Sequence, residues 1–136
     1  MTLGLLLKSG KEKLKKAQIA EWELDAWFLL EYVTGCTRHA YLLHPEQEVT
    51  ELQEQRYEEL IQKRSFHIPL QYLTGSQEFM GLSFFVDEHV LIPRQDTEIL
   101  VEEALRYLQD GMKVLDMCTG SGCILLSVLK LQGGLC

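Results

Sequence analysis

The sequence has no apolar run of the length that a membrane span requires. A helix that crosses a bilayer needs roughly 18 or more consecutive apolar residues, and polar or charged residues interrupt every hydrophobic stretch of this chain. The N-terminus also has no charged segment followed by an apolar stretch and a cleavage site, as a secretory leader has. We therefore expect a cytoplasmic protein with no membrane partner.

The chain also has no excess of basic residues. Its net charge is −7, with nine basic and eleven acidic residues in positions 1–74 and four and nine in positions 75–136. Proteins that bind nucleic acid concentrate lysine and arginine on the face that meets the phosphates. We therefore expect no direct binding to nucleic acid.

Cysteine is scarce, and its spacing does not favour a metal site. The four cysteines are Cys36, Cys118, Cys123 and Cys136. No pair has C-x-x-C spacing, and no histidine stands at zinc-finger distance. In a chain of the cytoplasm such cysteines are free and largely buried thiols, so we expect no metal.

With three prolines and 46% hydrophobic residues, the 136-residue chain is globular, and positions 1–74 predict a bundle of four or five helices. Thr37 and the pair Thr50 and Gln53 are typical of helix starts, and Gly35 is typical of a helix end. The apolar residues that we expect to face the core of this bundle are Leu3, Leu6, Leu7, Leu14, Trp22, Ala26, Leu29, Leu30, Val33, Tyr57, Leu60 and Ile61.

Nothing in the helical half indicates catalysis, because no carboxylate pair and no Ser/His/Asp set stands out. We expect Trp22 and Trp27 to pack in the core. A run of lysines in the first helix has two interpretations: a solvated helix face, which we favour, or a docking surface for an acidic partner. Its members are Lys8, Lys11, Lys15 and Lys16.

The middle of the chain predicts a hairpin and then an amphipathic helix. Residues 77–79 and 82–86 read as two strands around the turn Met80-Gly81, and residues 90–92 as a third extended run. Asp96 or Thr97 can cap the following helix. That helix carries its apolar stripe on Val101, Ala104, Leu105 and Leu108.

A glycine-bearing turn near residue 120 follows the run Lys113–Met117, which we predict to be a strand. Residues 123–131 then predict a second helix, so that strand, turn and helix read as the start of a doubly wound α/β sheet. Such a turn suits a nucleotide-like ligand, although by itself it is a weak signal. A nicotinamide-dependent dehydrogenase is disfavoured, because the turn is not G-x-G-x-x-G.

Four stretches in this order resemble the HemK family, the peptide chain release factor glutamine methyltransferases. They are Pro69-Leu70-Gln71-Tyr72-Leu73-Thr74-Gly75, Glu78-Phe79-Met80-Gly81-Leu82, Val90-Leu91-Ile92-Pro93-Arg94-Gln95-Asp96-Thr97-Glu98 and Asp116-Met117-Cys118-Thr119-Gly120-Ser121-Gly122. The I-P-R-x-x-T-E run is the most specific of them, whereas many methyltransferases share the glycine turn. The resemblance covers the whole chain.

The resemblance implies a helical domain over 1–74 that recruits a release factor, a β-hairpin linker over 75–92 and the start of a Rossmann-like methyltransferase domain over 93–136. It implies S-adenosylmethionine as cofactor and peptide chain release factors as protein substrate. The residues that match the cofactor turn are Asp116, Cys118, Thr119, Gly120, Ser121 and Gly122. Arg94 and Thr97 match the linker motif, where they either orient the cofactor pocket or cap a helix and form a surface ion pair. Cys118 stands where glycine is common in the wider motif, and its small side chain should not block the turn.

The sequence contains no asparagine. In the family, an Asn-Pro-Pro-Tyr motif accepts hydrogen bonds from the substrate amide, and this chain lacks it, so it offers no catalytic residue. We therefore expect a truncated enzyme that is inactive alone. The alternative is a non-catalytic module that binds a release factor.

Overall fold

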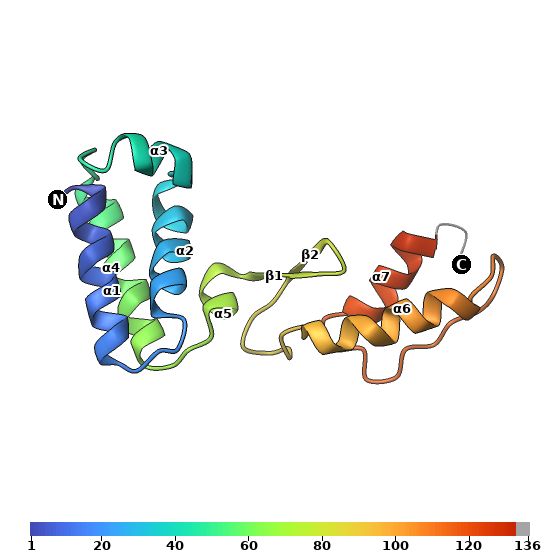
Figure 1. Ribbon diagram of the computed structural model, residues 1–136. Coiled ribbons are helices and arrows are strands. Elements are labelled where there is room, and N and C mark those ends of the chain that lie inside the picture. Colours follow the sequence, from blue (N-terminus) through green and yellow to red (C-terminus); the bar gives the residue numbers. More distant parts are fainter. Residues whose placement is uncertain (133–136) are drawn as a thin grey trace. The chain divides into compact units, whose positions relative to one another are not determined.

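The computed structural model describes residues 1–132. These residues belong to two compact units, Met1–Thr74 and a second unit that begins at Gly75. Figure 1 shows the elements of both in chain order. No helix within residues 1–132 has both the length and the apolar character that a bilayer crossing demands. Each unit is described below by itself.

The first unit is a helical bundle, as the sequence predicts. The helices α1 (Leu3–Lys16), α2 (Trp22–Thr34) and α4 (Glu51–Ser65) lie against one another (Figure 1). The short helix α3 (Arg38–Leu43) connects α2 to α4, and α5 (Leu70–Thr74) follows α4. The buried core of this unit is formed by Leu3, Leu6, Leu7, Leu14, Ile19, Ala26, Trp27, Leu29, Leu30, Tyr57, Leu60 and Ile61.

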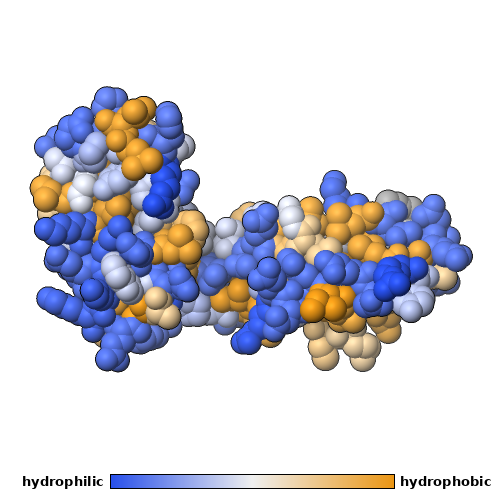
Figure 2. All heavy atoms as spheres, viewed as in Figure 1, coloured by the Kyte–Doolittle hydropathy of each residue, from blue (hydrophilic) through white to orange (hydrophobic). Residues whose placement is uncertain are grey.

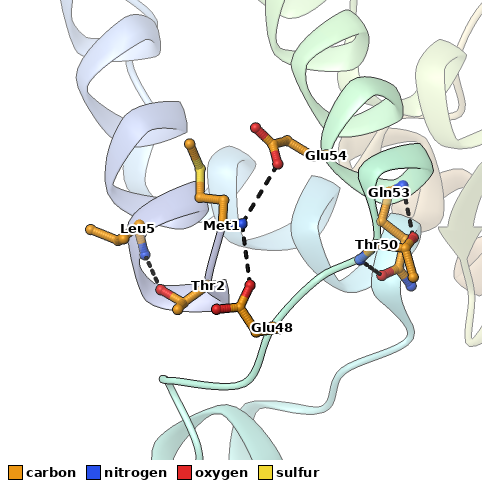
Figure 3. Close-up of polar contacts among 7 residues, drawn as sticks. All are labelled: Met1, Thr2, Leu5, Glu48, Thr50, Gln53 and Glu54. Atoms are coloured by element: carbon orange, nitrogen blue, oxygen red, sulfur yellow. Dashed lines mark hydrogen bonds and ion pairs between the residues drawn. The ribbon is translucent and has the colours of Figure 1, made fainter.

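The helix ends confirm the predicted caps. The Thr37 hydroxyl accepts a hydrogen bond from the backbone N–H of Ala40 at 3.2 Å. Thr50 and Gln53 form a reciprocal capping box, with hydrogen bonds of 3.0 and 3.2 Å (Figure 3). Gly35 ends α2 in the left-handed conformation, with φ of 70°. These bonds satisfy backbone groups that a helix leaves unpaired at its ends.

The first residues of the chain are tied to the segment that precedes α4. The ammonium group of Met1 lies 3.3 Å from the Glu48 carboxylate and 3.8 Å from that of Glu54 (Figure 3). The backbone N–H of Leu3 donates to the carbonyl of Gln47 at 2.9 Å. The start of α1 is therefore held by backbone pairing as well as by charge.

Tyr57 on α4 joins three helices of the bundle. Its side chain is 1% exposed, and its hydroxyl donates to the Ala26 carbonyl of α2 at 3.0 Å. Burial raises the pKa of this phenol, so the hydroxyl keeps its proton. The ring lies against Gly10 of α1, where an added Cβ would approach Cζ of Tyr57 to 2.8 Å. Glycine at this position therefore lets α1 and α4 approach closely.

A half-buried ion pair links α2 to the end of α4. Arg64 Nε donates to the Asp25 carboxylate at 2.9 Å, and the two side chains are 18% and 9% exposed. Arg64 also donates to the Ile68 carbonyl at 3.1 Å. Because the guanidinium satisfies a carboxylate and a loop carbonyl together, it fixes the chain direction after α4.

The second unit packs a hairpin on two helices. Strands β1 (Ser76–Phe79) and β2 (Leu82–Phe85) pair antiparallel around the predicted Met80-Gly81 turn. The helices α6 (Glu98–Tyr107) and α7 (Cys123–Gln132) contact each other. The buried cluster that joins hairpin and helices is Phe79, Phe84, Val101, Cys123 and Val128.

Two local predictions are wrong for this unit. Residues 113–117, which we predicted to be a strand, form none, and the only sheet within residues 1–132 is the hairpin. Extended segments become strands only when neighbouring segments satisfy their N–H and C=O groups. Before α6, a 3₁₀ turn η1 (Gln95–Thr97) intervenes, and the Thr97 side chain makes no capping hydrogen bond.

We predict that Gly10→Ala destabilises the first unit. Alanine normally stabilises a helix by up to about 1 kcal/mol relative to glycine. Here the added methyl group meets the Tyr57 ring, and overpacking of this kind costs about 1–3 kcal/mol. Urea unfolding followed by circular dichroism measures the free energy of unfolding.

The matched control for this prediction is a double-mutant cycle with Tyr57→Phe. Removing the hydroxyl relieves part of the clash, so the double variant should lose less stability than the two single variants together. Strict additivity, or a stabilising Gly10→Ala, would contradict the close approach of α1 and α4.

Candidate functional site

The predicted cofactor turn follows an extended segment that has one open face. Along residues 113–117 exposure alternates: Val114 and Asp116 are half-buried, whereas Lys113, Leu115 and Met117 are exposed. A period of two is the mark of extended backbone. One face of the segment therefore leans on the second unit, and the other carries two apolar side chains into solvent.

Hydrogen bonds within residues 116–122 shape the turn. Thr119 Oγ1 donates to the Asp116 carboxylate at 2.9 Å. The Gly122 N–H donates to the Thr119 carbonyl at 2.9 Å, and the Leu126 N–H then donates to the Gly122 carbonyl as α7 begins. The carboxylate that ends the extended segment is thus fixed to the turn, immediately before the first amides of a helix.

Three residues of the turn have left-handed backbone. The φ angles are 58° at Cys118, 58° at Gly120 and 79° at Gly122. A residue with a side chain adopts this region at a cost of about 1–2 kcal/mol, and glycine at position 118 would not carry that cost. The exposed cysteine is accommodated, and the turn is formed.

The outer side of the turn is open. A Cβ built on Gly120 would have no atom within 4 Å, whereas one on Gly122 would meet Cδ1 of Leu126 at 3.2 Å. Cys118 and Thr119 are exposed, and Ser121 is half-buried. The turn is therefore closed toward α7 and accessible at Gly120, so its small residues fit a ligand that approaches the backbone closely.

The remaining predicted site residues are not joined to the turn. Arg94 is exposed and Thr97 is half-buried; the backbone N–H of Thr97 donates to the Arg94 carbonyl at 3.0 Å. Among residues 1–132 no hydrogen bond links either side chain to residues 116–122. No group of three potential metal ligands occurs in the described part of the chain. The role of Arg94 and Thr97 toward a cofactor stays a prediction.

Glu98 is a residue whose role sequence reasoning missed. Its carboxylate accepts a hydrogen bond from the Met80 N–H at 2.9 Å, across 18 positions of sequence. Met80 begins the hairpin turn, and Glu98 begins α6. Glu98 closes the I-P-R-x-x-T-E run, but nothing in that run indicates the hairpin as its partner.

The first unit carries a surface hollow of about 450 Å³. Trp22, Trp27 and Tyr41 line it, and the Trp27 and Tyr41 rings pack edge to face with centroids 5.5 Å apart. The Arg38 guanidinium lies 5.5 Å from the Trp27 ring centroid, and Leu42 on the rim is 70% exposed. Trp27 is buried, as expected, whereas Trp22 is only half-buried against the core, and the sequence did not indicate the hollow.

We predict that Glu98→Ala loosens the hairpin from α6. The variant leaves the half-buried Met80 N–H without its acceptor, which costs about 1–3 kcal/mol. Amide exchange measured by NMR should accelerate at Met80.

Glu98→Gln is the conservative variant, because its amide oxygen can still accept the hydrogen bond from the Met80 N–H. It should change Met80 exchange less than Glu98→Ala does, and the exposed Glu102→Ala should not change it. Equal exchange in all three variants would contradict the contact.

The matches to known proteins all indicate the same family. The sequence profile described as "PrmC N-terminal domain" matches residues 6–75. A release factor glutamine methyltransferase of Clostridium botulinum is 39% identical over 130 residues, which are 94% of this chain and 46% of that protein. A protein of the same name from Koribacter versatilis is 39% identical over 96% of this chain and 47% of its own length. Another from Salmonella typhimurium is 45% identical over 76% of this chain and 38% of its own length.

The chain thus spans about half the length of the curated relatives it matches. The matched residues cover the helical unit, and in the longer alignments nearly all of the chain. The resemblance drawn from the sequence is therefore confirmed: the chain belongs to the HemK family of release factor glutamine methyltransferases, which the PrmC N-terminal domain identifies.

Proposed function

We propose that this chain forms the recruiting and cofactor-contacting part of a release factor glutamine methyltransferase. Such an enzyme methylates the side-chain amide nitrogen of the glutamine in the Gly-Gly-Gln motif of a peptide chain release factor. The observation that carries the proposal is the turn before α7. In this turn the Thr119 hydroxyl donates a hydrogen bond to the Asp116 carboxylate, and the backbone at Gly120 is accessible. It lies in a chain 39% identical to relatives of that name.

The cofactor that fits this proposal is S-adenosylmethionine, which supplies an activated methyl group when bound. Gly120 leaves the backbone accessible, and the small side chains of Cys118, Thr119 and Ser121 leave room for a ligand. Asp116, held by Thr119, presents carboxylate oxygens to an ammonium group or to loop amides. Gly122 packs the turn onto α7 through Leu126.

The acceptor side of the reaction has no candidate residue in this chain. An amide nitrogen is a poor nucleophile, and acceptors aimed at its N–H groups stabilise the charge that develops on it. The resemblance gives this role to Asn-Pro-Pro-Tyr, and the 136 residues contain no asparagine. We expect the chain by itself to transfer no methyl group.

A methyl-transfer assay tests this proposal. Purified 1–136 should leave a release factor unlabelled by radioactive S-adenosylmethionine. In a chimera, residues 1–136 replace the matched half of the Clostridium botulinum relative. This chimera should label the release factor of that organism. In the chimera, Asp116→Ala should lower kcat/KM by about tenfold or more.

Asp110→Ala is the matched control, because this exposed aspartate precedes the extended segment. It should keep the rate of the chimera. Labelling by 1–136 alone would refute the inactivity of the chain. An inactive chimera beside an active relative would count against the proposed function.

A second function is favoured by the hollow of the first unit. Residues 1–74 have their own core, and the hollow presents the half-buried Trp22 and Tyr41 beside charged side chains, with the exposed Leu42 on its rim. Aromatic residues and arginine are enriched at surfaces that recognise other proteins. Under this alternative the chain is a non-catalytic module that holds a release factor.

A pull-down with residues 1–92 tests the module. The fragment should capture a purified release factor, and Leu42→Asp should reduce capture by about tenfold or more, because it places a charge on the rim of the hollow. Leu52→Asp is the matched control: Leu52 is 76% exposed on α4 and does not line the hollow. Equal capture by both variants would exclude the hollow as the binding surface.

A further inference from the structure

The first unit exposes apolar side chains among its polar ones, as the orange spheres in Figure 2 show. Three of them form a row on α2: Leu24, Phe28 and Tyr32 are 44%, 42% and 50% exposed and follow one another at a spacing of four residues. Residues at i, i+4 and i+8 make one ridge on a helix surface. Because Ala26 and Leu29 of the same helix fill the core, this α2 ridge lies on the side that the bundle leaves uncovered.

The charges beside the α2 ridge are acidic. Glu21, the N-cap residue, stands three positions before Leu24, and the exposed Glu31 stands three positions after Phe28. Residues three apart on a helix are neighbours on its surface. The helix itself contains no lysine or arginine. The ridge is therefore an apolar row with a carboxylate near each end.

The cations that reach α2 from other helices do not neutralise these two carboxylates. Two of them pair with the other acidic residues of α2, and two lie over its tryptophan rings; they are Lys11, Arg64, Lys15 and Arg38. Among residues 1–132, neither Glu21 nor Glu31 forms an ion pair. Their charge is available to a partner.

The α2 ridge is also distinct from the hollow of the first unit. Leu24 belongs to both, but Phe28 and Tyr32 do not line the hollow. Substitutions at these two positions therefore change the ridge and leave the lining of the hollow as it is.

Charge decides which occupant fits the ridge. A second copy of this chain carries a net charge of −7, and within positions 1–74 it has nine basic against eleven acidic residues. Nucleic acid and membranes with anionic headgroups are negative as well, so both are repelled by the carboxylates. The complementary occupant is a protein segment with apolar side chains on one face and lysine or arginine beside them.

We propose that the α2 ridge is a docking site for a basic amphipathic helix of another protein. A row of residues four apart packs into the groove between two such rows of a facing helix. The apolar anchors of the partner then cover Phe28 and Tyr32, while its cations reach Glu21 and Glu31. The proposal goes beyond the proposed function, because neither the glycine turn nor methyl transfer takes part in it.

Fluorescence anisotropy with the full 136-residue chain and labelled synthetic helices tests the proposal. The probe helix carries leucines along one face and lysines beside them. One control helix has the same composition with its leucines spread around the helix, and a second has glutamate in place of every lysine. The probe should bind at least about tenfold more tightly than either control.

Phe28→Ala and Leu52→Ala are the matched variants for the apolar part of the site. Both residues are exposed on a helix of the first unit, but Leu52 lies on α4. Phe28→Ala should weaken binding of the probe by about tenfold, because it removes the central anchor of the ridge. Leu52→Ala should not change it, and circular dichroism should show both variants folded.

Glu31→Lys tests the charge, with Glu12→Lys on α1 as the control that makes the same change in net charge. Glu31→Lys should weaken binding of the lysine probe and strengthen binding of the glutamate helix, since it reverses the local charge. Glu12 is exposed on a different helix, so its replacement should shift both affinities much less.

Equal binding of the three helices, unchanged affinity of Phe28→Ala, or equal effects of the two charge reversals would each overturn the proposal. Self-association of the chain that Phe28→Ala abolishes would overturn it too, because the occupant would then be a second copy. None of these measurements uses a cofactor or a release factor, so their failure leaves the proposed function intact.

Discussion

The helical unit depends on the packing of Tyr57 beneath Gly10. The phenol reaches from α4 to the Ala26 carbonyl of α2, while its ring occupies the space that a side chain at position 10 of α1 would take. Most buried hydroxyls are hydrogen-bonded, and this bond ties α4 to α2. The leucines around it fill the remaining core, and the ion pair between Arg64 and Asp25 fixes the direction of the chain after α4.

The second unit is stabilised by a different kind of contact. Phe79 and Phe84 of the hairpin pack edge to face, with ring centroids 6.2 Å apart, and Val101 of α6 lies in the same buried cluster. The hydrogen bond from Met80 to Glu98 adds a polar contact at the hairpin turn. These contacts do not involve residues 113–117, which form no strand in the described part of the chain.

The features on which the proposed function rests are divided between the two units. The glycine turn, with its fixed carboxylate and accessible backbone, lies in the second unit, and the aromatic hollow lies in the first. Under the proposed function, positioning a methyl donor and holding a protein substrate are separate physical tasks, because the first needs a tight turn and the second needs a contact surface. A chain with both features is consistent with the proposed methyltransferase function. The hollow alone is consistent with the alternative, a module that binds a release factor without catalysing a reaction.

The sequence by itself determined the helices, the caps at Thr37 and Thr50, the hairpin and the glycine turn. These features rest on local rules: Thr50 and Gln53 are three residues apart, and Met80 and Gly81 form the hairpin turn by their own backbone angles. The candidate turn residues lie together for the same reason, because they are consecutive. Only the tertiary structure decided that residues 113–117 form no strand, that Glu98 bonds to Met80 and that Trp22, Trp27 and Tyr41 line one hollow. Each of these depends on partners distant in sequence, and a local pattern does not specify which partner is present.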